Sequence, residues 1–387
     1  IGGGFTGCSA ALSAAKNGLS VTLVDKKIGY GGSGRNVGLV NAGLWMPPEK
    51  VESILGLDAG VKLNKALATA PDLVFSLIDN YEINCSANRS GTLHCAHSKK
   101  GLKDIHLRFK QLSERGAELE LLDKQQTQER IGSSKFFGSL FNKKAGIINP
   151  LDYCLGLARV AKSYGVNIYE STIATNIESI NNDWLIQTAE GTIKAKMLLI
   201  ATNAYQKPIE GLNPSKYTSV QYFQVATKSL PSDLVKSVLP NGEGCWDTAS
   251  VMSSFRLDAD NRLIIGGIGN LGHSASKIHT NWARRKIESL FPHLKNIDIE
   301  FSWHGRIAMT GDHIPKILRL GSNAYSVFGY SGRGIGPGTY FGKAVSECLI
   351  SGDETSLPVD PLDYYQEPFS KIKAGFIEFS ATASHLL

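Results

Sequence analysis

The pattern of apolar and polar residues predicts strands and helices that alternate along the chain. An alanine-rich helix is expected over residues 8–17, followed by an apolar strand over residues 20–25. Continuous apolar runs at 195–201 and 324–328 are typical of strands buried on both faces of a parallel sheet, and a further helix is expected over 339–350. This alternation predicts an α/β fold.

A glycine-rich turn precedes the first predicted helix. Residues 2–7 read Gly-Gly-Gly-Phe-Thr-Gly, a GxGxxG pattern that allows a tight turn, close approach of a pyrophosphate and close packing of the helix. The helix N-terminus would offer free N–H groups to phosphates. Asp25 follows about twenty residues later, where a carboxylate binds ribose hydroxyls. The residues expected at the adenosine half of a dinucleotide are Gly2, Gly4, Phe5, Thr6, Gly7, Asp25 and Lys26.

Two more glycine-rich loops, at 29–38 and 329–338, favour FAD over NAD. The first follows the strand that ends in Asp25, where NAD enzymes usually continue into further βαβ units. The second leads into a helix whose N-terminus could stabilise the negative charge of a reduced flavin. Both loops could instead be ordinary surface turns. The further residues expected at the cofactor are Gly32, Ser33, Arg35, Asn36, Val37, Gly38, Ile173, Ala201, Thr202, Asn203, Gly332, Arg333, Gly334, Ile335 and Gly336.

Five segments of the sequence resemble the D-amino-acid-oxidase-like superfamily of FAD enzymes, which includes glycine, sarcosine and L-pipecolate oxidases. They read IGGGFTG, VTLVDKKIGYGGSGRNVGLVNAG, LLIATNAY, WHGRIAMTGDHIPKI and GYSGRGIGPGTYFGKAV, and they span nearly the whole chain. The γ-glutamylputrescine-oxidase-like branch is the most similar, because a GxSGRN loop and a GYxGRG loop occur together in it. The resemblance implies FAD as the cofactor.

The resemblance also implies a Rossmann-type FAD-binding domain with an inserted α+β substrate domain that carries a mixed or antiparallel sheet. Segments with glycine-rich turns alternate with segments that lack them, which sets the expected boundaries. The FAD-binding domain is expected at 1–45, 145–215 and 305–360, the substrate domain at 46–144 and 216–304, and a C-terminal tail at 361–387. The strand expected before the first glycine turn is almost absent, so we expect residues upstream of Ile1.

The chemistry that the resemblance implies is oxidation of the C–N bond of an amine or amino acid, with hydride transfer to flavin N5 and hydrolysis of the imine. Arg306 could hold a substrate carboxylate through two hydrogen bonds, as in a γ-glutamyl amine or a secondary amino acid, or could form a structural ion pair. Tyr222 and Gln224 share one face of a strand that lines the pocket in relatives, and His304 lies nearby in sequence. Cys348 falls inside the last predicted helix, so noncovalent FAD is expected.

Composition adds few constraints. The 41 basic and 35 acidic residues are interspersed, which gives no support for nucleic-acid binding. No apolar run approaches a transmembrane span, although peripheral membrane contact stays open. The six cysteines are dispersed, which favours reduced thiols and a cytoplasmic location, and the His94–His97 segment has no second cluster that would indicate a metal site. The expected partners are a small amine or amino-acid substrate and either O2 or a quinone as electron acceptor.

Two other functions stay open at this stage. One is a flavoprotein of another reaction class, such as a hydroxylase or an NAD(P)H-linked enzyme, although no second dinucleotide motif is visible. The other is a non-catalytic subunit with the FAD-binding fold.

Overall fold

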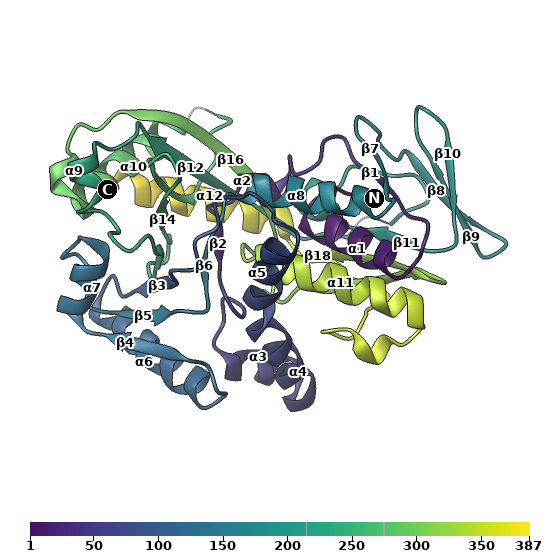
Figure 1. The fold of residues 1–387 in the computed structure, drawn as a ribbon, viewed down its shortest axis with the longest axis horizontal. Coiled ribbons are helices and arrows are strands. Elements are labelled where there is room, and N and C mark those ends of the chain that lie inside the picture. The colour runs from purple at the N-terminus through teal and green to yellow at the C-terminus, as the bar shows by residue number, and fades with distance from the viewer. Residues whose placement is uncertain (214, 274) are drawn as a thin grey trace.

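The computed structural model of the chain describes residues 1–213, 215–273 and 275–387. Figure 1 shows two regions side by side: a large sheet with its own helices, and the glycine turn with smaller sheets and the helices around them. This mixed α/β architecture confirms the predicted fold class. None of the helices in the described ranges has the length and apolar character that crossing a membrane requires.

The region around the glycine turn is built on parallel strands. These are β1 (Thr22–Val24), β7 (Asn167–Tyr169), β11 (Leu198–Ile200) and β18 (Ala324–Phe328), with β17 (Lys316–Gly321) antiparallel beside β18. β1 pairs with β7, and β11 pairs with β18. The first two residues link these pairs, because Gly2 N donates to Val24 O at 2.9 Å and Ala201 N donates to Ile1 O at 2.8 Å.

Three helices pack around the glycine turn: α1 (Phe5–Lys16), α8 (Pro150–Ser163) and α11 (Ile335–Ser351). α1 and α11 approach closely because a β-carbon on Gly342 would collide with the main-chain oxygen of Thr6. Ser9 Oγ adds a hydrogen bond of 2.7 Å to Thr339 O. The two helices are thereby held beside the first glycine turn.

α11 begins earlier than the predicted start at residue 339. Pro337 falls in its first turn, where a missing N–H costs no intrahelical hydrogen bond. Gly336 and Gly338 therefore belong to the helix and not to the expected loop, which ends at Gly334.

Shorter elements complete this region. A three-stranded antiparallel meander comprises β8 (Asn176–Ile180), β9 (Asp183–Gln187) and β10 (Thr192–Ala195). Between the two regions lie α2 (Gly32–Arg35), the β2 (Leu39–Val40) and β6 (Gly146–Ile147) pair, α3 (Pro48–Leu55), α4 (Leu57–Ala68) and α5 (Ala70–Asn80). Short 3-10 turns span Asn203–Tyr205, Pro292–Leu294 and Glu354–Ser356.

The large sheet joins strands from both predicted inserts in the order β16-β12-β15-β14-β13-β3-β5-β4. Its strands are β3 (Thr92–Cys95), β4 (Leu119–Leu122), β5 (Ser139–Asn142), β12 (Thr218–Thr227), β13 (Gly244–Asp247), β14 (Ser254–Leu257), β15 (Leu263–Ile268) and β16 (Ile299–Met309). β13 and β3 run parallel while the other neighbours are antiparallel, so the sheet is mixed, as expected. The domain boundaries themselves stay a prediction.

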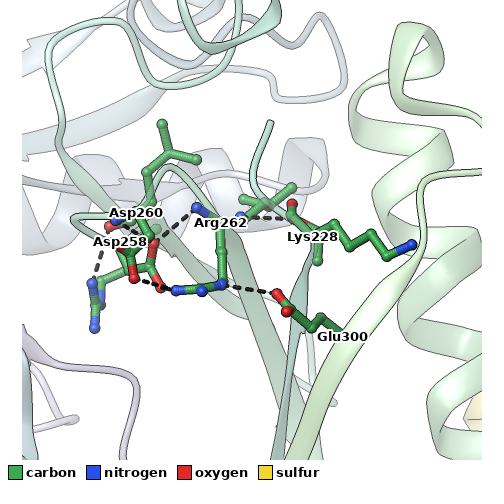
Figure 2. A network of polar contacts seen from close by, with 9 residues as sticks. Lys228, Asp258, Asp260, Arg262 and Glu300 are labelled. Carbon is green, nitrogen blue, oxygen red and sulfur yellow. Dashed lines mark hydrogen bonds and ion pairs between the residues drawn. The ribbon is translucent and has the colours of Figure 1, made fainter. Parts of the chain in front are cut away.

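A network of charged side chains connects the β14–β15 turn to β16 (Figure 2). Arg262 Nε donates to Glu300 at 3.0 Å, and the same guanidinium contacts Asp258 and Asp260. These carboxylates raise the pKa of Arg262. Because exposed ion pairs contribute little stability, we interpret the network mainly as a determinant of strand register.

Helices cover the large sheet, and one of them comes from the C-terminal tail. They are α6 (Lys99–Ser113), α7 (Lys124–Ile131), α9 (Ser232–Val235), α10 (Ser276–Leu290) and α12 (Ser370–Leu386). α12 packs against β12 and alongside α10. Buried aromatic residues fill the core beneath α10, including Phe223, Phe255 and Phe291.

Candidate active site

A cavity of about 920 Å³ is lined by residues from both regions. One wall contains the first glycine turn and the loops at 30–37 and 330–334, and the opposite wall contains β12, β14, β15 and β16. The predicted cofactor and substrate residues are therefore brought together from segments more than 300 positions apart, such as Gly4 and Arg333.

Most of the predicted site residues line this cavity. They are Gly2, Gly4, Phe5, Thr6, Asp25, Lys26, Gly32, Ser33, Arg35, Asn36, Val37, Ile173, Ala201, Thr202, Asn203, Tyr222, Gln224, Arg306, Gly332, Arg333, Gly334 and Ile335. Four predicted residues lie outside the lining: Gly7, Gly38, His304 and Gly336.

The three glycines outside the lining have packing roles. A β-carbon on Gly7 would collide with Gly2 O, so this glycine lets α1 pack on the turn, as its motif position predicts. Gly38 has a φ of +87° and lies against Ile148 O. Gly336 faces α5 from the first turn of α11, which explains why it does not reach the cavity.

His304 and Arg306 share one face of the sheet, and Tyr222 of the neighbouring strand β12 lies on the other. Arg306 pairs with Gln221 across the strands, whereas Tyr222 pairs with Gly305. Because neighbouring positions of a strand face opposite sides, the side chains of Arg306 and Tyr222 leave opposite faces of the sheet, although both residues line the cavity. The pKa of His304 is lowered by burial and by the nearby Arg35 and Arg306, so it is neutral near pH 7.

Arg306 lies at the exposed rim of the cavity, over the ring of Tyr205. Its guanidinium carbon is 4.6 Å from the ring centroid, and Arg306 N donates to Tyr205 Oη at 2.9 Å. No acidic residue in the described ranges forms an ion pair with it, so the alternative of a structural ion pair has no support among them.

The glycine turn is closed on one side by the second loop and by Asp25. Phe5 N donates to Ser33 Oγ at 3.0 Å, and Gly3 N donates to Asp25 Oδ2 at 2.5 Å. A β-carbon on Gly4 would lie 2.8 Å from Ser33 Oγ, so a larger residue at this position would displace the Ser33 side chain. Each carboxylate oxygen of Asp25 has a second lone pair for a hydroxyl donor. The turn at the start of α1 is therefore suited to a phosphate, with a ribose beside it.

Gln224 is the unsatisfied polar side chain on the opposite wall. Its neighbour on the same face, Tyr222, is satisfied by Ser254 Oγ at 3.0 Å and by Gly266 O at 3.1 Å. Gln224 has no exposed surface, and neither atom of its amide has a partner among the described residues. A buried amide is normally hydrogen-bonded, so a ligand group or an ordered water is expected to supply its partners.

Arg333 places a positive charge on the cavity wall without a counter-ion. Its Nη1 donates to Ala42 O at 2.8 Å and Leu44 O at 2.9 Å, and no acidic residue in the described ranges forms an ion pair with it. Burial, and secondarily Arg108, lowers the pKa of Arg333 to about 9, so it stays protonated at neutral pH. An anion bound in the cavity would compensate this charge.

Two tryptophans that sequence reasoning missed lie beside Arg333. The Trp246 ring centroid is 4.8 Å from the guanidinium carbon, and Trp45 lies 6.3 Å from Trp246 between centroids. His94 stacks on Trp246, and burial, Arg108 and Arg333 lower its pKa well below the usual value. Trp45 lies seven residues after the glycine-rich loop at 29–38, but no sequence signal connects it to Trp246 some 200 positions later.

The family model described as FAD dependent oxidoreductase (DAO) matches residues 1–348. The chain belongs to this family. The resemblance inferred from the glycine-rich motifs is thus confirmed, and so is the assignment of an FAD-dependent oxidoreductase. DAO-family proteins bind FAD, and the open anion site at α1, the Asp25 carboxylate and the glycine at position 4 fit that cofactor.

Curated relatives and solved structures agree with this assignment. The probable oxidoreductase OrdL of Haemophilus influenzae is 31% identical, with 92% of this chain and 83% of the relative covered. Gamma-glutamylputrescine oxidoreductase of Escherichia coli is 29% identical, with 91% and 83% covered. Glycine oxidase from Geobacillus kaustophilus has a TM-score of 0.74 at 19% identity, with 92% of this chain and 95% of that protein covered, which shows a common fold.

Proposed function

We propose that this DAO-family enzyme oxidises the C–N bond of an amine or amino acid that carries a carboxylate. The observation that carries the proposal is the unpaired guanidinium of Arg333, enclosed in the same cavity as the glycine turn. A partly buried cation without a counter-ion is costly, so its position at the cavity wall supports an anionic ligand.

The chain's residues would divide the work between cofactor and substrate. Asp25, Ser33 and the first turn of α1 would hold the adenosine and pyrophosphate of FAD noncovalently, since no cysteine or histidine occurs among the described lining residues. When bound, FAD supplies a hydride acceptor for the carbon next to the amine, and the imine formed hydrolyses in water.

Arg333 would hold the carboxylate by two parallel hydrogen bonds, which fixes the orientation of the substrate. The amide of Gln224 would then bind a polar group of the substrate from the opposite wall. Trp45 and Trp246 would exclude water around the bound carboxylate, which strengthens its attraction to Arg333.

A γ-glutamyl amine or a secondary amino acid would supply both the carboxylate for Arg333 and the C–N bond that is oxidised. The name of the Escherichia coli relative supports the first of these substrate classes. Either O2 or a quinone would reoxidise the cofactor. The six free, buried cysteines are compatible with a cytoplasmic location.

Substitution of two arginines tests the proposal. We expect Arg333→Met to lower kcat/KM for the carboxylate-bearing substrate by about 100-fold or more, because it removes a desolvated charge pair. Arg306→Met is the matched control at the rim, with an expected loss of less than about fivefold. A large loss in Arg306→Met together with an unchanged Arg333→Met would contradict the assignment of Arg333.

A further inference from the structure

Large apolar side chains lie on the outward face of α12. Ile372, Phe376, Phe379 and Leu386 are each between 64% and 72% exposed. Their spacing of three, four or seven residues places them on one side of the helix. We call these four residues the α12 stripe. An aligned row of large exposed apolar side chains is uncommon in a surface helix and marks an interaction surface.

The inward face of α12 is fixed to the protein by polar contacts. Glu378 accepts from Asn270 N at 3.0 Å and lies 3.2 Å from His279 Nε2, while His385 Nδ1 lies 2.8 Å from His279 Nδ1. Trp282 stacks on His385 with ring centroids 4.1 Å apart. The α12 stripe is therefore held outward by a docked helix and belongs to a defined surface.

Basic side chains border the α12 stripe. Lys371 and Lys373 lie about a quarter turn to either side of Ile372, and both are exposed, with Lys373 forming an ion pair with the buried Glu367. Arg285 is exposed at the other end, where its guanidinium donates to His385 O. The one acidic residue of α12, Glu378, is turned inward toward His279. A helix with an outward apolar face and flanking lysines has the pattern of helices that lie in the interface of anionic membranes.

We propose that the α12 stripe docks the enzyme onto an anionic lipid bilayer. From Ile372 to Leu386 the stripe is about 20 Å long, which suits a helix lying flat in the headgroup region. The side chains of Lys371 and Arg285 would extend to lipid phosphates while the phenylalanines enter the acyl boundary. No residue of the α12 stripe lines the cavity, so this surface does not rest on the proposed catalytic function.

A second copy of the chain is a less suitable occupant. If two α12 helices packed antiparallel, Lys371 and Lys373 would face Arg285 of the other copy, and parallel packing would bring the lysines together. No exposed carboxylate on α12 compensates either arrangement. An anionic surface meets both the apolar and the electrostatic requirement.

Flotation of the FAD-loaded chain with lipid vesicles tests the proposal. We expect at least about tenfold stronger partitioning to vesicles that contain about one-third phosphatidylglycerol than to pure phosphatidylcholine, and loss of this preference near 0.5 M NaCl. The double variant Phe376→Ser, Phe379→Ser should bind the anionic vesicles at least about tenfold more weakly. Lys371→Glu should weaken binding by about fivefold or more.

Leu57→Ser is the matched control, since Leu57 is 68% exposed on α4, outside the α12 stripe, and its loss should leave partitioning unchanged. Unaltered flavin absorbance and thermal midpoint would show that each variant is folded. Absence of flotation, or equal flotation of the wild type and the double variant, would overturn the proposal. So would a dimer that dissociates in the double variant without any vesicle binding, because it would assign the stripe to a second copy.

Discussion

At the scale of single residues, the cavity contains polar groups whose partners are missing from the protein itself. Gln224 is fully buried on β12 with both amide atoms unsatisfied, although an unpaired buried amide costs about 1–3 kcal/mol. The room for this side chain comes from Gly266, where a β-carbon would collide with the amide.

Replacement of Gln224 should therefore separate stability from activity. We expect Gln224→Leu to leave the ligand-free protein as stable as the wild type or about 1 kcal/mol more stable, because it removes an unsatisfied buried amide. The same change should lower kcat/KM by at least about tenfold. Gln221→Leu, on the opposite face of the same strand, is the control for steady-state kinetics and thermal unfolding. A Gln224→Leu variant with full activity would exclude the proposed contact.

The first glycine turn gives a second prediction at this scale. Gly4→Ala should raise the Kd for FAD by about tenfold or more, because its methyl group would displace Ser33 from Phe5 N beside the phosphate site. Gly375→Ala is the control, since a β-carbon there meets open space on α12. Titration of the flavin-free protein followed by flavin fluorescence would measure both values. Equal Kd values for FAD in the wild type and in Gly4→Ala would argue against a cofactor at this turn.

At the scale of elements, the sequence predicted the strands and helices that lead to the cofactor more accurately than it predicted their ends. The strand at 324–328 agrees with β18, whereas α1 begins at Phe5 and not at residue 8. Glycines at helix starts were interpreted as loop residues, because their helical state depends on close packing against another helix. The sequence predicted only a C-terminal tail for the residues of α12. The apolar stripe that makes this helix amphipathic faces outward and not into a core.

The contact between α10 and α12 should make stability depend on pH. Burial, and secondarily His279, lowers the pKa of His385 to about 3, while an unfolded histidine titrates near 6.5. Between these values the unfolded state binds a proton that the folded state does not, so stability falls as pH decreases from about 6.5 toward about 3. The slope per such histidine is at most about 1.4 kcal/mol per pH unit.

Unfolding midpoints measured between pH 7 and pH 5 test this dependence. His94 and His304 have lowered pKa values for the same main reason, burial, so three histidines contribute to the slope. We expect His385→Leu to flatten the pH dependence by roughly a third while also lowering stability at pH 7 through the lost contact with His279. If the stability of His385→Leu depended on pH as steeply as that of the wild type, His385 would be ruled out as a source of the pH dependence.

At the scale of the whole molecule, the site exists because two sheets face one cavity. Most residues that the glycine motifs predicted at the cofactor line this cavity, since each motif is local and its residues share one turn. The substrate side depends on β12, β13 and β14 meeting the loop at 330–334, and this long-range pairing is not encoded in any short pattern. For this reason Arg333 was expected at the cofactor and Arg306 at the substrate, whereas the charge balance of the cavity favours Arg333 for the substrate.

The most direct test of the central claim is anaerobic stopped-flow reduction of the FAD-loaded enzyme by a matched pair of amines. One is a γ-glutamyl amine, and the other is the same compound with its carboxylate converted to a carboxamide. We predict that the carboxylate compound bleaches the flavin absorbance with a second-order rate constant at least about 100-fold higher, as expected for loss of a buried charge pair. Equal rates for the two compounds, or no bleaching by any carboxylate-bearing amine or amino acid, would contradict the account.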